Sequence, residues 1–388
     1  MGHGPGDFHA RRKEIVFMPS EKPQTVLILQ GGGALGSYQG GAVEGLIEHG
    51  VDFDWVVGTS IGAINGALIA GNPPEKRLQN LQAFWDHVAF DHVPLQSLMP
   101  FAAPWLQSLD STLKTMGPLL KGVRGFFAPR PGSLLNPGAK LQAHEVGFYD
   151  TSQLETTLNR LVDFDYLNSG NVRYCACAVH VPSGKLAVFD TTEQPITAKH
   201  VMASGALPPG FPPVVIDGEA YWDGGIYSNT PMDIVLDDAE RCDALCFMID
   251  LRDPTESTPS TINDAMTRLK DIQYASRSHE QIDTHAMLQN MRRAIRILHQ
   301  RLSDEEREHP DVKRLEALGC GHTINIVRII MKALADDNQS KDIDFSRATV
   351  DARWAAGRHD VERVFQRKSW LDIPPDHIGL IVHELEQE

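Results

Sequence analysis

The sequence is short of positive charge. It contains 36 lysines and arginines against 51 aspartates and glutamates, which gives a formal net charge of −15. A surface this acidic repels phosphates, so sequence-independent nucleic-acid binding is excluded as a function and no nucleic-acid partner is expected. The same charge disfavours electrostatic docking on anionic lipid, so any contact with a membrane has to be apolar or local.

Disulfide and metal frameworks are also lacking. The five cysteines are an odd number, and Cys175 and Cys177 alternate within an apolar, strand-like run, which is typical of buried thiols in a reducing compartment. Neither Cys175 and Cys177 nor Cys242 and Cys246 are accompanied by the further histidines or cysteines of a zinc site. No acidic run has the spacing of a calcium loop. We therefore expect no metal and no cofactor.

Long apolar runs are absent as well. No stretch reaches the roughly 18 apolar residues that a membrane span requires. Residues 1–23 lack the apolar core of a signal peptide and carry several charges, so they are expected to form a flexible tail. These absences favour a cytoplasmic protein that is at most peripheral to a membrane or to lipid granules.

Two strand–turn–helix units follow the tail. A β-branched apolar run over 25–30 is followed by the glycine-rich residues 31–36 and then by a helical pattern. A second strand-like run over 55–57 is followed by the turn 58–62 and a helix of small residues. Successive units of this kind predict a mainly parallel central sheet with helices packed on both faces, a three-layer α/β/α fold.

The remaining patterns divide the chain. Further helices are expected at 77–89, 152–162 and 197–204, strands at 171–180, 185–190 and 244–250, and a hairpin at 214–222. Residues 90–136 are apolar but interrupted by prolines, and form either a lid or acyl-chain groove, with walls from Phe101, Trp105, Phe126 and Phe127, or an ordinary packed insertion. Beyond about residue 255 the chain becomes helical and charged, with helical patterns over 260–300 and 346–366 and one strand-like run at 322–330. We therefore expect an α/β hydrolase domain over 24–255 and a mostly helical C-terminal extension over 256–388.

The second turn has the spacing of a nucleophilic serine. Ser60 lies between Gly58 and Gly62, and glycines at these positions let a strand and the following helix approach closely while the hydroxyl stays exposed. The helix that begins after Ser60 directs its N–H groups toward a reacting carbonyl. This pattern also occurs by chance, so a structural turn remains the alternative.

The first turn offers a cluster of backbone N–H groups. Gly31, Gly32, Gly33 and Ala34 follow the first strand, and Gly36 opens the next helix. Such a cluster binds an anion, either a nucleotide phosphate or the oxyanion of acyl transfer. The spacing fits a phosphate-binding fingerprint poorly, and the serine turn on the next strand favours an oxyanion hole.

The base that would activate the serine is less evident. None of the sixteen histidines lies in a local motif, and His180 and His200 are interpreted as structural. Asp223 precedes Gly224 and Gly225 at the end of a strand-like run, a pattern that by itself usually marks only a turn.

Together these residues resemble the patatin-like phospholipase family. The resemblance covers residues 25 to about 235 and has four blocks in the family order: the glycine loop 31–36, the serine turn 58–62, the A-S-x-A-x-P-x-x-F-P-P block 203–213, and Asp223-Gly224-Gly225 followed by Asn229-Thr230-Pro231. The region after residue 255 is similar to the uncharacterised C-terminal extension of a bacterial group of these proteins, a group discussed with polyhydroxybutyrate metabolism.

The resemblance implies a patatin-like fold and a lipid acyl hydrolase with a Ser60–Asp223 dyad and an acyl-enzyme intermediate. The fifth position of the glycine loop is often a cation in the family but is Leu35 here, which puts the rate and the head-group preference in doubt. An acyltransferase on the same scaffold and a noncatalytic lipid-binding or granule-associated protein remain alternatives. The expected partners are a lipid or other acyl ester, a transient membrane or lipid-granule surface, and a second copy in a homodimer.

Overall fold

The structure is a computed structural model that describes the chain in segments. They are residues 23–91, 117–130, 132–133, 136, 138–238, 243–253, 258–334, 337, 340–367, 370 and 375–384, without the side chains of 263 and 276–280. The predicted tail over 1–23 lies almost entirely outside the described residues. So do Phe101 and Trp105 of the predicted lid.

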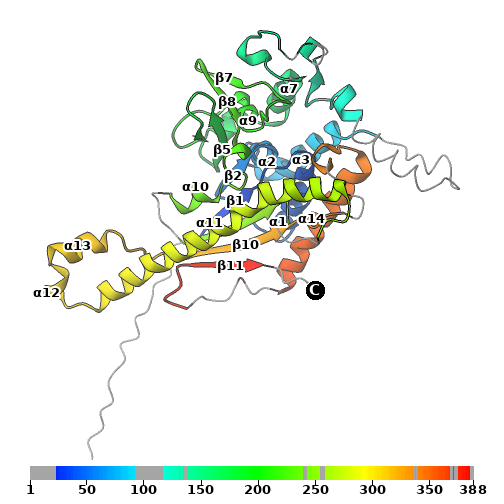
Figure 1. Ribbon diagram of the computed structural model, residues 1–388. Coiled ribbons are helices and arrows are strands. Elements are labelled where there is room, and N and C mark those ends of the chain that lie inside the picture. Colours follow the sequence, from blue (N-terminus) through cyan, green and yellow to red (C-terminus); the bar gives the residue numbers. More distant parts are fainter. Residues whose placement is uncertain are drawn as a thin grey trace, which may run out of the picture.

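A mostly parallel sheet forms the centre of the molecule (Figure 1). Its strand order is β11-β10-β9-β1-β2-β5-β8-β7, and β6 pairs with β5. The strands are β1 (Gln24–Leu29), β2 (Trp55–Thr59), β5 (Arg173–His180), β6 (Lys185–Asp190), β7 (Val214–Ile216), β8 (Glu219–Asp223), β9 (Ala244–Asp250), β10 (Ile324–Ile330) and β11 (Leu380–Glu384). From β11 to β5 all neighbours are parallel, whereas β6, β7 and β8 pair antiparallel. A separate two-stranded sheet joins β3 (Ala128–Pro129) and β4 (Tyr149–Asp150).

Helices cover both faces of this sheet. The longer ones are α1 (Gly36–Glu48), α2 (Ile61–Ala70), α3 (Pro74–Val88), α7 (Ser152–Leu161), α11 (Ile262–Arg301) and α14 (Arg347–Arg367). The short ones are α8 (Phe164–Leu167), α9 (Ala198–Ser204), α10 (Met232–Leu236), α12 (Asp304–Arg307) and α13 (Pro310–Glu316), with 3-10 turns η1 (Gly33–Leu35), η2 (Ala143–Glu145), η3 (Gly224–Ile226) and η4 (Lys341–Ile343).

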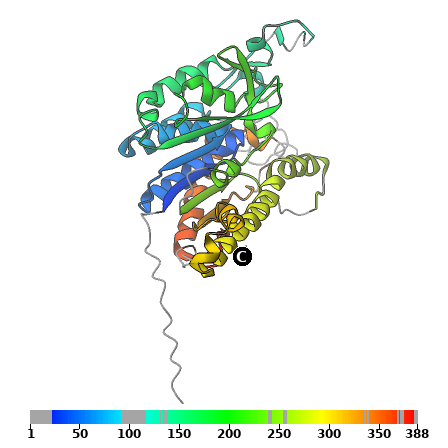
Figure 2. The same ribbon diagram turned by 90° about the vertical axis from the view of Figure 1, so that its left-hand side faces the viewer.

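The three layers follow from strand alternation. In β1, Leu27 and Leu29 belong to one buried cluster, together with residues of α1, α2, α3 and α14. Val26 and Ile28 belong to a second cluster, with residues of α10 and α11 on the opposite face. Figure 2 shows α14 and the blue N-terminal helices on one side of the molecule and α11 on the other. The predicted α/β/α architecture is confirmed.

The C-terminal region is mostly helical, as expected, but it also completes the sheet. β10 pairs in parallel with β9, and β11 pairs with β10. Helix α14 packs closely against α1, where the Tyr38 hydroxyl donates a 2.7 Å hydrogen bond to Asp360. Strands β10 and β11 and helix α14 of this mostly helical region are therefore part of the same sheet and core.

Helix α11 connects strand β9 to the elements of the C-terminal region. Thr261 and Asp264 cap its first turn, each side chain accepting from the other's backbone N–H. Its N-terminal half lies along the body, and its C-terminal half extends away toward α12 and α13 (Figure 1). This path carries residues 270–274 to the end of the sheet where Ser60 lies.

Candidate active site

Ser60 occupies a strained turn between β2 and α2. Its φ of 57° and ψ of −123° are unfavourable for a residue with a side chain, and such strain is concentrated at functional sites. A Cβ on Gly62 would lie 2.3 Å from the Leu29 carbonyl oxygen, and one on Gly58 would lie 2.4 Å from the Gly62 backbone. The predicted supporting glycines therefore allow β1, β2 and α2 to meet at this turn.

The sheet register brings Asp223 to the serine. Thr59, the last residue of β2, pairs with Cys177 of β5. Asp223, the last residue of the antiparallel β8, pairs with the next residue, Ala178. Strand β6 pairs along one edge of β5. Strands β2 and β8 therefore both pair along the opposite edge of β5, where the ends of the two strands meet. The Ser60 Oγ donates a 2.6 Å hydrogen bond to Asp223 Oδ2 across this junction.

Asp223 is buried and held in one orientation. It is 2% exposed, and its Oδ1 accepts a 2.7 Å hydrogen bond from the N–H of Gly225. Gly224 permits the turn, since a Cβ there would lie 2.3 Å from the Cys177 carbonyl oxygen. Burial raises the pKa of Asp223 to about 6, although hydrogen bonds from Ser60 and Gly225 oppose the rise. A carboxylate with this pKa is a stronger base than an ordinary aspartate.

The glycine loop lies beside the serine. Gly31, Gly32 and Gly33 line the same cavity as Ser60, and a Cβ on Gly31 would be 3.1 Å from that of Ser60. The Gly31 N–H already donates to the Asn229 carbonyl at 3.1 Å. Ala34 is fully buried and is not among the residues that line the cavity. Of the four predicted oxyanion donors, Gly32 and Gly33 are those that line the cavity and have no backbone acceptor described for their N–H groups.

Gly36 has a packing role at the start of α1. A Cβ there would lie 2.5 Å from the Ile61 side chain, immediately after the nucleophile turn. Leu35, the residue in place of a loop cation, is fully buried in the apolar core. The loop itself thus brings no charged side chain to the cavity.

Two polar side chains hold the serine turn and the loop in place. The fully buried Ser204, at the end of α9, accepts a 2.9 Å hydrogen bond from the Ser60 N–H. The Asn229 side chain donates to the Gly31 carbonyl at 3.1 Å, so Asn229 is bonded to the loop twice. Both lie in the motif blocks 203–213 and 229–231, yet sequence reasoning gave neither a role. Their motif positions are the only signal that could have found them.

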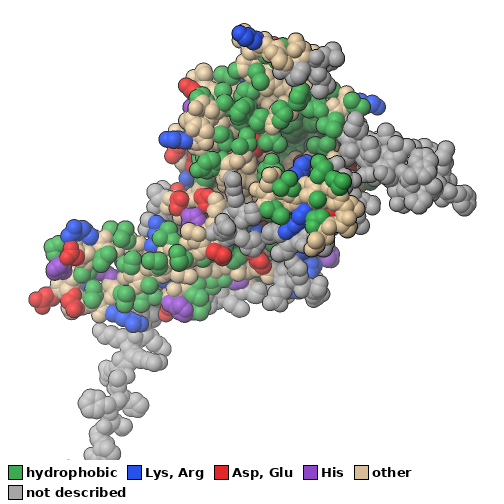
Figure 3. Space-filling view, in the orientation of Figure 1, with side chains coloured by type: hydrophobic (Ala, Val, Ile, Leu, Met, Phe, Trp, Pro, Cys, Tyr) green, Lys and Arg blue, Asp and Glu red, His purple; other side chains and the backbone are tan. Residues whose placement is uncertain are grey.

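The catalytic candidates open into an apolar cavity of about 400 Å³. Its aromatic wall consists of Phe126, Phe127, Tyr149, Phe211 and Phe345, whose rings contact one another. Two of these residues belong to the predicted apolar groove. Figure 3 shows hydrophobic side chains gathered around a hollow in the upper part of the molecule. The volume and lining suit a fatty-acyl chain.

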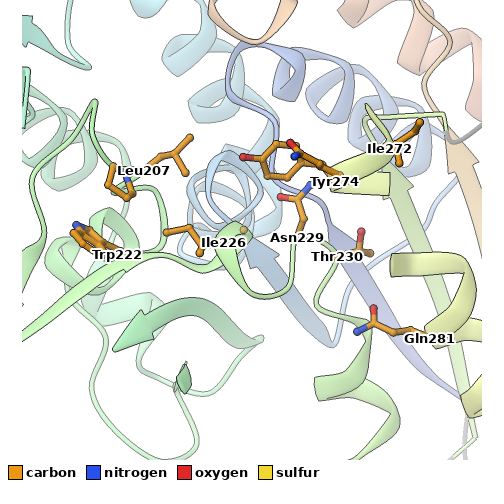
Figure 4. A pocket seen from close by; sticks show the side chains of 11 residues that line it. Leu207, Trp222, Ile226, Asn229, Thr230, Ile272, Tyr274 and Gln281 are labelled. Atoms are coloured by element: carbon orange, nitrogen blue, oxygen red, sulfur yellow. The ribbon is translucent and has the colours of Figure 1, made fainter. Parts of the chain in front are cut away.

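A second pocket of about 670 Å³ shares part of this lining. In Figure 4, Leu207 and Trp222 lie on one side and Ile272 and Gln281 on the other, with Ile226, Asn229 and Tyr274 between them. The shared residues are Leu207, Pro208, Gly225, Asn229, Gln273 and Tyr274. Helix α11 thus supplies one wall of the approach to Ser60.

The two histidines considered above are bonded elsewhere. His180 contacts Ser183 and Glu219, and the buried His200 caps the start of α9 through Thr197. No histidine is among the described residues that line the cavity. In the described part of the chain, Cys175, Cys177, Cys246 and Cys320 are buried thiols, and no helix there is long and apolar enough to cross a bilayer.

Comparison with protein families agrees with this geometry. A family model described as patatin-like phospholipase matches residues 27–236, more than half of the chain. The chain belongs to the patatin-like phospholipase family. A second model, described as patatin phospholipase, matches residues 272–377 and so covers most of the C-terminal region.

Individual relatives of this patatin-like chain are distant. Lysophospholipase nte1 of Aspergillus terreus is 43% identical over 65 residues, which are 17% of this chain and 4% of that protein. Patatin-like phospholipase domain-containing protein ZK370.4 of Caenorhabditis elegans is 24% identical over 57% of this chain and 13% of its own length. The chain therefore spans only a small part of the curated relatives it matches.

Solved structures give weaker likenesses. VipD from Legionella pneumophila aligns with 89% of this chain and 67% of its own, at 13% identity and a TM-score of 0.37. The type III effector protein ExoU aligns with 90% of this chain and 54% of its own, at 13% identity and a TM-score of 0.32. Likenesses at this level say nothing about activity.

Proposed function

We propose that this chain is a serine hydrolase that cleaves acyl esters of lipids through Ser60 and Asp223. The observation that carries the proposal is the 2.6 Å hydrogen bond from a strained serine to a buried carboxylate, at the wall of an apolar cavity. Membership in the patatin-like phospholipase family and the similarity to a lysophospholipase of Aspergillus support a lipid as the substrate.

The first half-reaction forms an acyl-enzyme. Ser60 Oγ attacks the ester carbonyl carbon while its proton passes to Asp223 Oδ2. The carbonyl oxygen becomes an oxyanion that accepts hydrogen bonds from the N–H groups of Gly32 and Gly33. When the tetrahedral intermediate collapses, the C–O bond of the ester breaks and the leaving alcohol takes the proton from Asp223.

The second half-reaction restores the enzyme. Asp223 accepts a proton from water, and the resulting hydroxide attacks the acyl carbon. Collapse of this intermediate releases the carboxylic acid and returns the proton to Ser60. The pKa of about 6 suits Asp223 to both directions of transfer, because it is ionised at neutral pH yet accepts a proton more readily than an ordinary aspartate.

The test uses Ser60→Ala on p-nitrophenyl butyrate and on a lysophospholipid. We expect kcat/KM to fall at least about a thousandfold, since nucleophile and base act as a unit. Ser183→Ala, at the exposed turn between β5 and β6, is the matched control and keeps full activity. Equal rates for Ser60→Ala and the unaltered protein would overturn the proposal.

Two further measurements separate the alternative functions. A fluorophosphonate probe labels the unaltered protein but not Ser60→Ala if the serine is activated, whereas a noncatalytic lipid-binding protein is not labelled. Product analysis with added glycerol distinguishes hydrolysis, which yields free fatty acid, from acyl transfer, which yields a glycerol ester.

A further inference from the structure

A group of charged side chains borders the catalytic cavity. Arg252 and Lys270 line the cavity that contains Ser60 and the glycine loop, and Asp342 lies between them. The Arg252 guanidinium bonds to Asp271 at 2.7 Å, and Lys270 pairs with Asp342 at 3.2 Å. Charged walls are unexpected here, since the rest of the lining is largely apolar.

The sheet places Arg252 beside the glycine loop. β9 runs parallel to β1 with Ile249 opposite Leu29, so the residues after both strands emerge side by side. Leu251 packs on Gly32, within 2.7 Å of where a Cβ of that glycine would be. On the other side of the loop, the Asp342 carbonyl oxygen lies 2.3 Å from the corresponding position on Gly33. The charged group is therefore built around the loop.

Positive charge is in excess in this group, which does not include Asp223 on the serine side of the same cavity. It contains three cations, Arg252, Lys270 and Lys341, and two carboxylates, Asp271 and Asp342; Lys341 pairs with Asp271 at 2.8 Å. Arg252 is 3% exposed, and its Nε has no hydrogen-bond partner among the residues that the structure describes. A buried guanidinium N–H without an acceptor is costly unless a ligand provides one.

We propose that Arg252 and Lys270 form a subsite for a phosphate group carried by the alcohol part of the ester substrate. The inference rests on the proposed hydrolase function and deepens it. Phosphate offers several acceptor oxygens at once, which suits the fork of an arginine and the point charge of a lysine. With the acyl chain in the aromatic part of the cavity, the scissile ester lies at Ser60 and the phosphate reaches the cations. Arg252, just after β9, and Lys270, in α11, thus bring positive charge to the cavity, whereas Leu35 in the glycine loop brings none.

The experiment compares two substrates that differ only in phosphate. We would measure kcat/KM for 1-oleoyl lysophosphatidic acid and for 1-oleoylglycerol, in detergent micelles of one composition. We expect the unaltered protein to prefer the phosphate ester at least tenfold. Lys270→Gln should reduce this preference by a factor of about ten, mainly through KM of the phosphate ester, whereas Lys185→Gln on the exposed strand β6 leaves it unchanged.

Arg252 is tested with a conservative change, because removing its charge leaves Asp271 buried without its guanidinium partner. Arg252→Lys keeps a cation but lacks the Nε–H, so the preference for the phosphate ester should fall severalfold. An unchanged ratio in both variants would overturn the subsite. An equal loss of kcat on both esters would also overturn it, since that result assigns the cations to the oxyanion.

Two outcomes separate this inference from its premise and from a free-anion site. If no ester is hydrolysed and Ser60→Ala behaves like the unaltered protein, the proposed function fails, and the subsite with it. If 1-oleoylglycerol is hydrolysed without any preference for the phosphate ester, only the subsite fails. A rate on 1-oleoylglycerol that depends on added inorganic phosphate through Lys270, with no preference between the esters, would identify a free-phosphate site and overturn the head-group assignment.

Discussion

At the scale of single residues, the active site is governed by the burial of one carboxylate. Asp223 is 2% exposed, and it has no positively charged partner in the hydrogen bonds described for it; its contacts are the Ser60 hydroxyl and the Gly225 N–H. Two neutral donors do not fully replace the hydration that the carboxylate has lost. The raised pKa of Asp223 is the result, and it has consequences for both activity and stability.

The pH profile should report this carboxyl group. Because only the ionised form accepts the serine proton, kcat/KM for a neutral ester should fall about tenfold per pH unit below the Asp223 pKa of about 6 and level off above it. The measurement uses p-nitrophenyl butyrate, an ester that does not itself ionise. The released p-nitrophenol is followed at its isosbestic wavelength, because the phenol titrates near neutral pH. A profile that stays flat down to about pH 4, the ordinary aspartate range, would show that Asp223 is not the titrating base.

Asp223→Asn should inactivate the protein yet stabilise it at neutral pH. The rise from the ordinary pKa of 3.8 to about 6 corresponds to roughly 3 kcal/mol of unfavourable ionisation in the folded state. Below the ordinary pKa of 3.8 the carboxyl is protonated in both states, so the cost is absent; it grows between that pKa and the raised Asp223 pKa of about 6, and it is fully present above the raised value.

Urea unfolding at two pH values tests this. At pH 8 the free energy of unfolding of Asp223→Asn should exceed that of the unaltered protein by about 1–3 kcal/mol, and at pH 4 the two should agree. Asp217→Asn, at the tip of the β7–β8 hairpin, is the control. A variant that is less stable than the unaltered protein at pH 8 would show that the charged form is favoured by contacts beyond those described.

At the scale of elements, the closest contact is between α1 and α14. A Cβ on Gly41 would lie 1.8 Å from the Trp354 carbonyl oxygen, and one on Gly357 would lie 2.1 Å from the Tyr38 carbonyl oxygen. Glycines on both helices thus let the two backbones touch. Since α1 carries the glycine loop at its N-terminus, this contact also helps to fix the loop.

Gly41→Ala should therefore be strongly destabilising. The added methyl group meets backbone atoms that cannot rotate away, so α14 has to move, and we expect a loss of about 3 kcal/mol in the free energy of unfolding. The matched control is Gly117→Ala, in the helical residues 117–121, where a Cβ meets nothing within 4 Å among the residues that the structure describes. The control should stabilise the protein by up to about 1 kcal/mol, as expected of alanine in a helix. Equal effects of the two changes, in thermal or urea unfolding, would contradict the close packing.

At the scale of the whole molecule, the approach to the cavity bears an exposed apolar face. Ile262, Met266 and Leu269 are 81%, 50% and 57% exposed, and their spacing places them on one face of α11 together with Gln273, which lines the cavity. Because a net charge of −15 disfavours electrostatic attraction to anionic lipid, we expect any contact with a lipid surface to be made through apolar side chains of this kind. We propose that this face meets the lipid surface during catalysis.

The double variant Met266→Asp/Leu269→Asp tests this face. Hydrolysis of phosphatidylcholine vesicles should fall about tenfold, because apolar contact with the bilayer is lost, while hydrolysis of soluble p-nitrophenyl butyrate changes little. Leu315→Asp/Leu318→Asp, two residues 53% and 56% exposed at and just after α13, is the control and should match the unaltered protein. Unchanged vesicle hydrolysis in the first variant would exclude this part of α11 as the contact.

Local sequence determined the elements and pointed to the candidate site residues. The β-branched runs, the helical spacing and the glycine turns correctly predicted β1, β2, α2, β5, β6, β9, α11 and α14 within a few residues, since hydrophobic period and turn chemistry are local properties. The short segments α8, α12, α13 and β11 were not predicted, because each contains too few residues for a repeat of hydrophobic positions to be recognised. The motifs singled out Ser60 and Asp223, but neither their contact nor their roles follow from spacing alone.

Only the tertiary structure determined which segments of the chain are neighbours in space. The meeting of Ser60 with Asp223 depends on two strands sharing one edge of β5, and no local pattern encodes that register. The pairing of β10 with β9 made the strand-like run of the mostly helical C-terminal region a part of the central sheet, because a strand's partner is chosen by burial across the whole chain. The same long-range packing placed Arg252 and Lys270 at the cavity, 192 and 210 residues beyond Ser60 in the sequence, where composition alone indicated only an acidic protein.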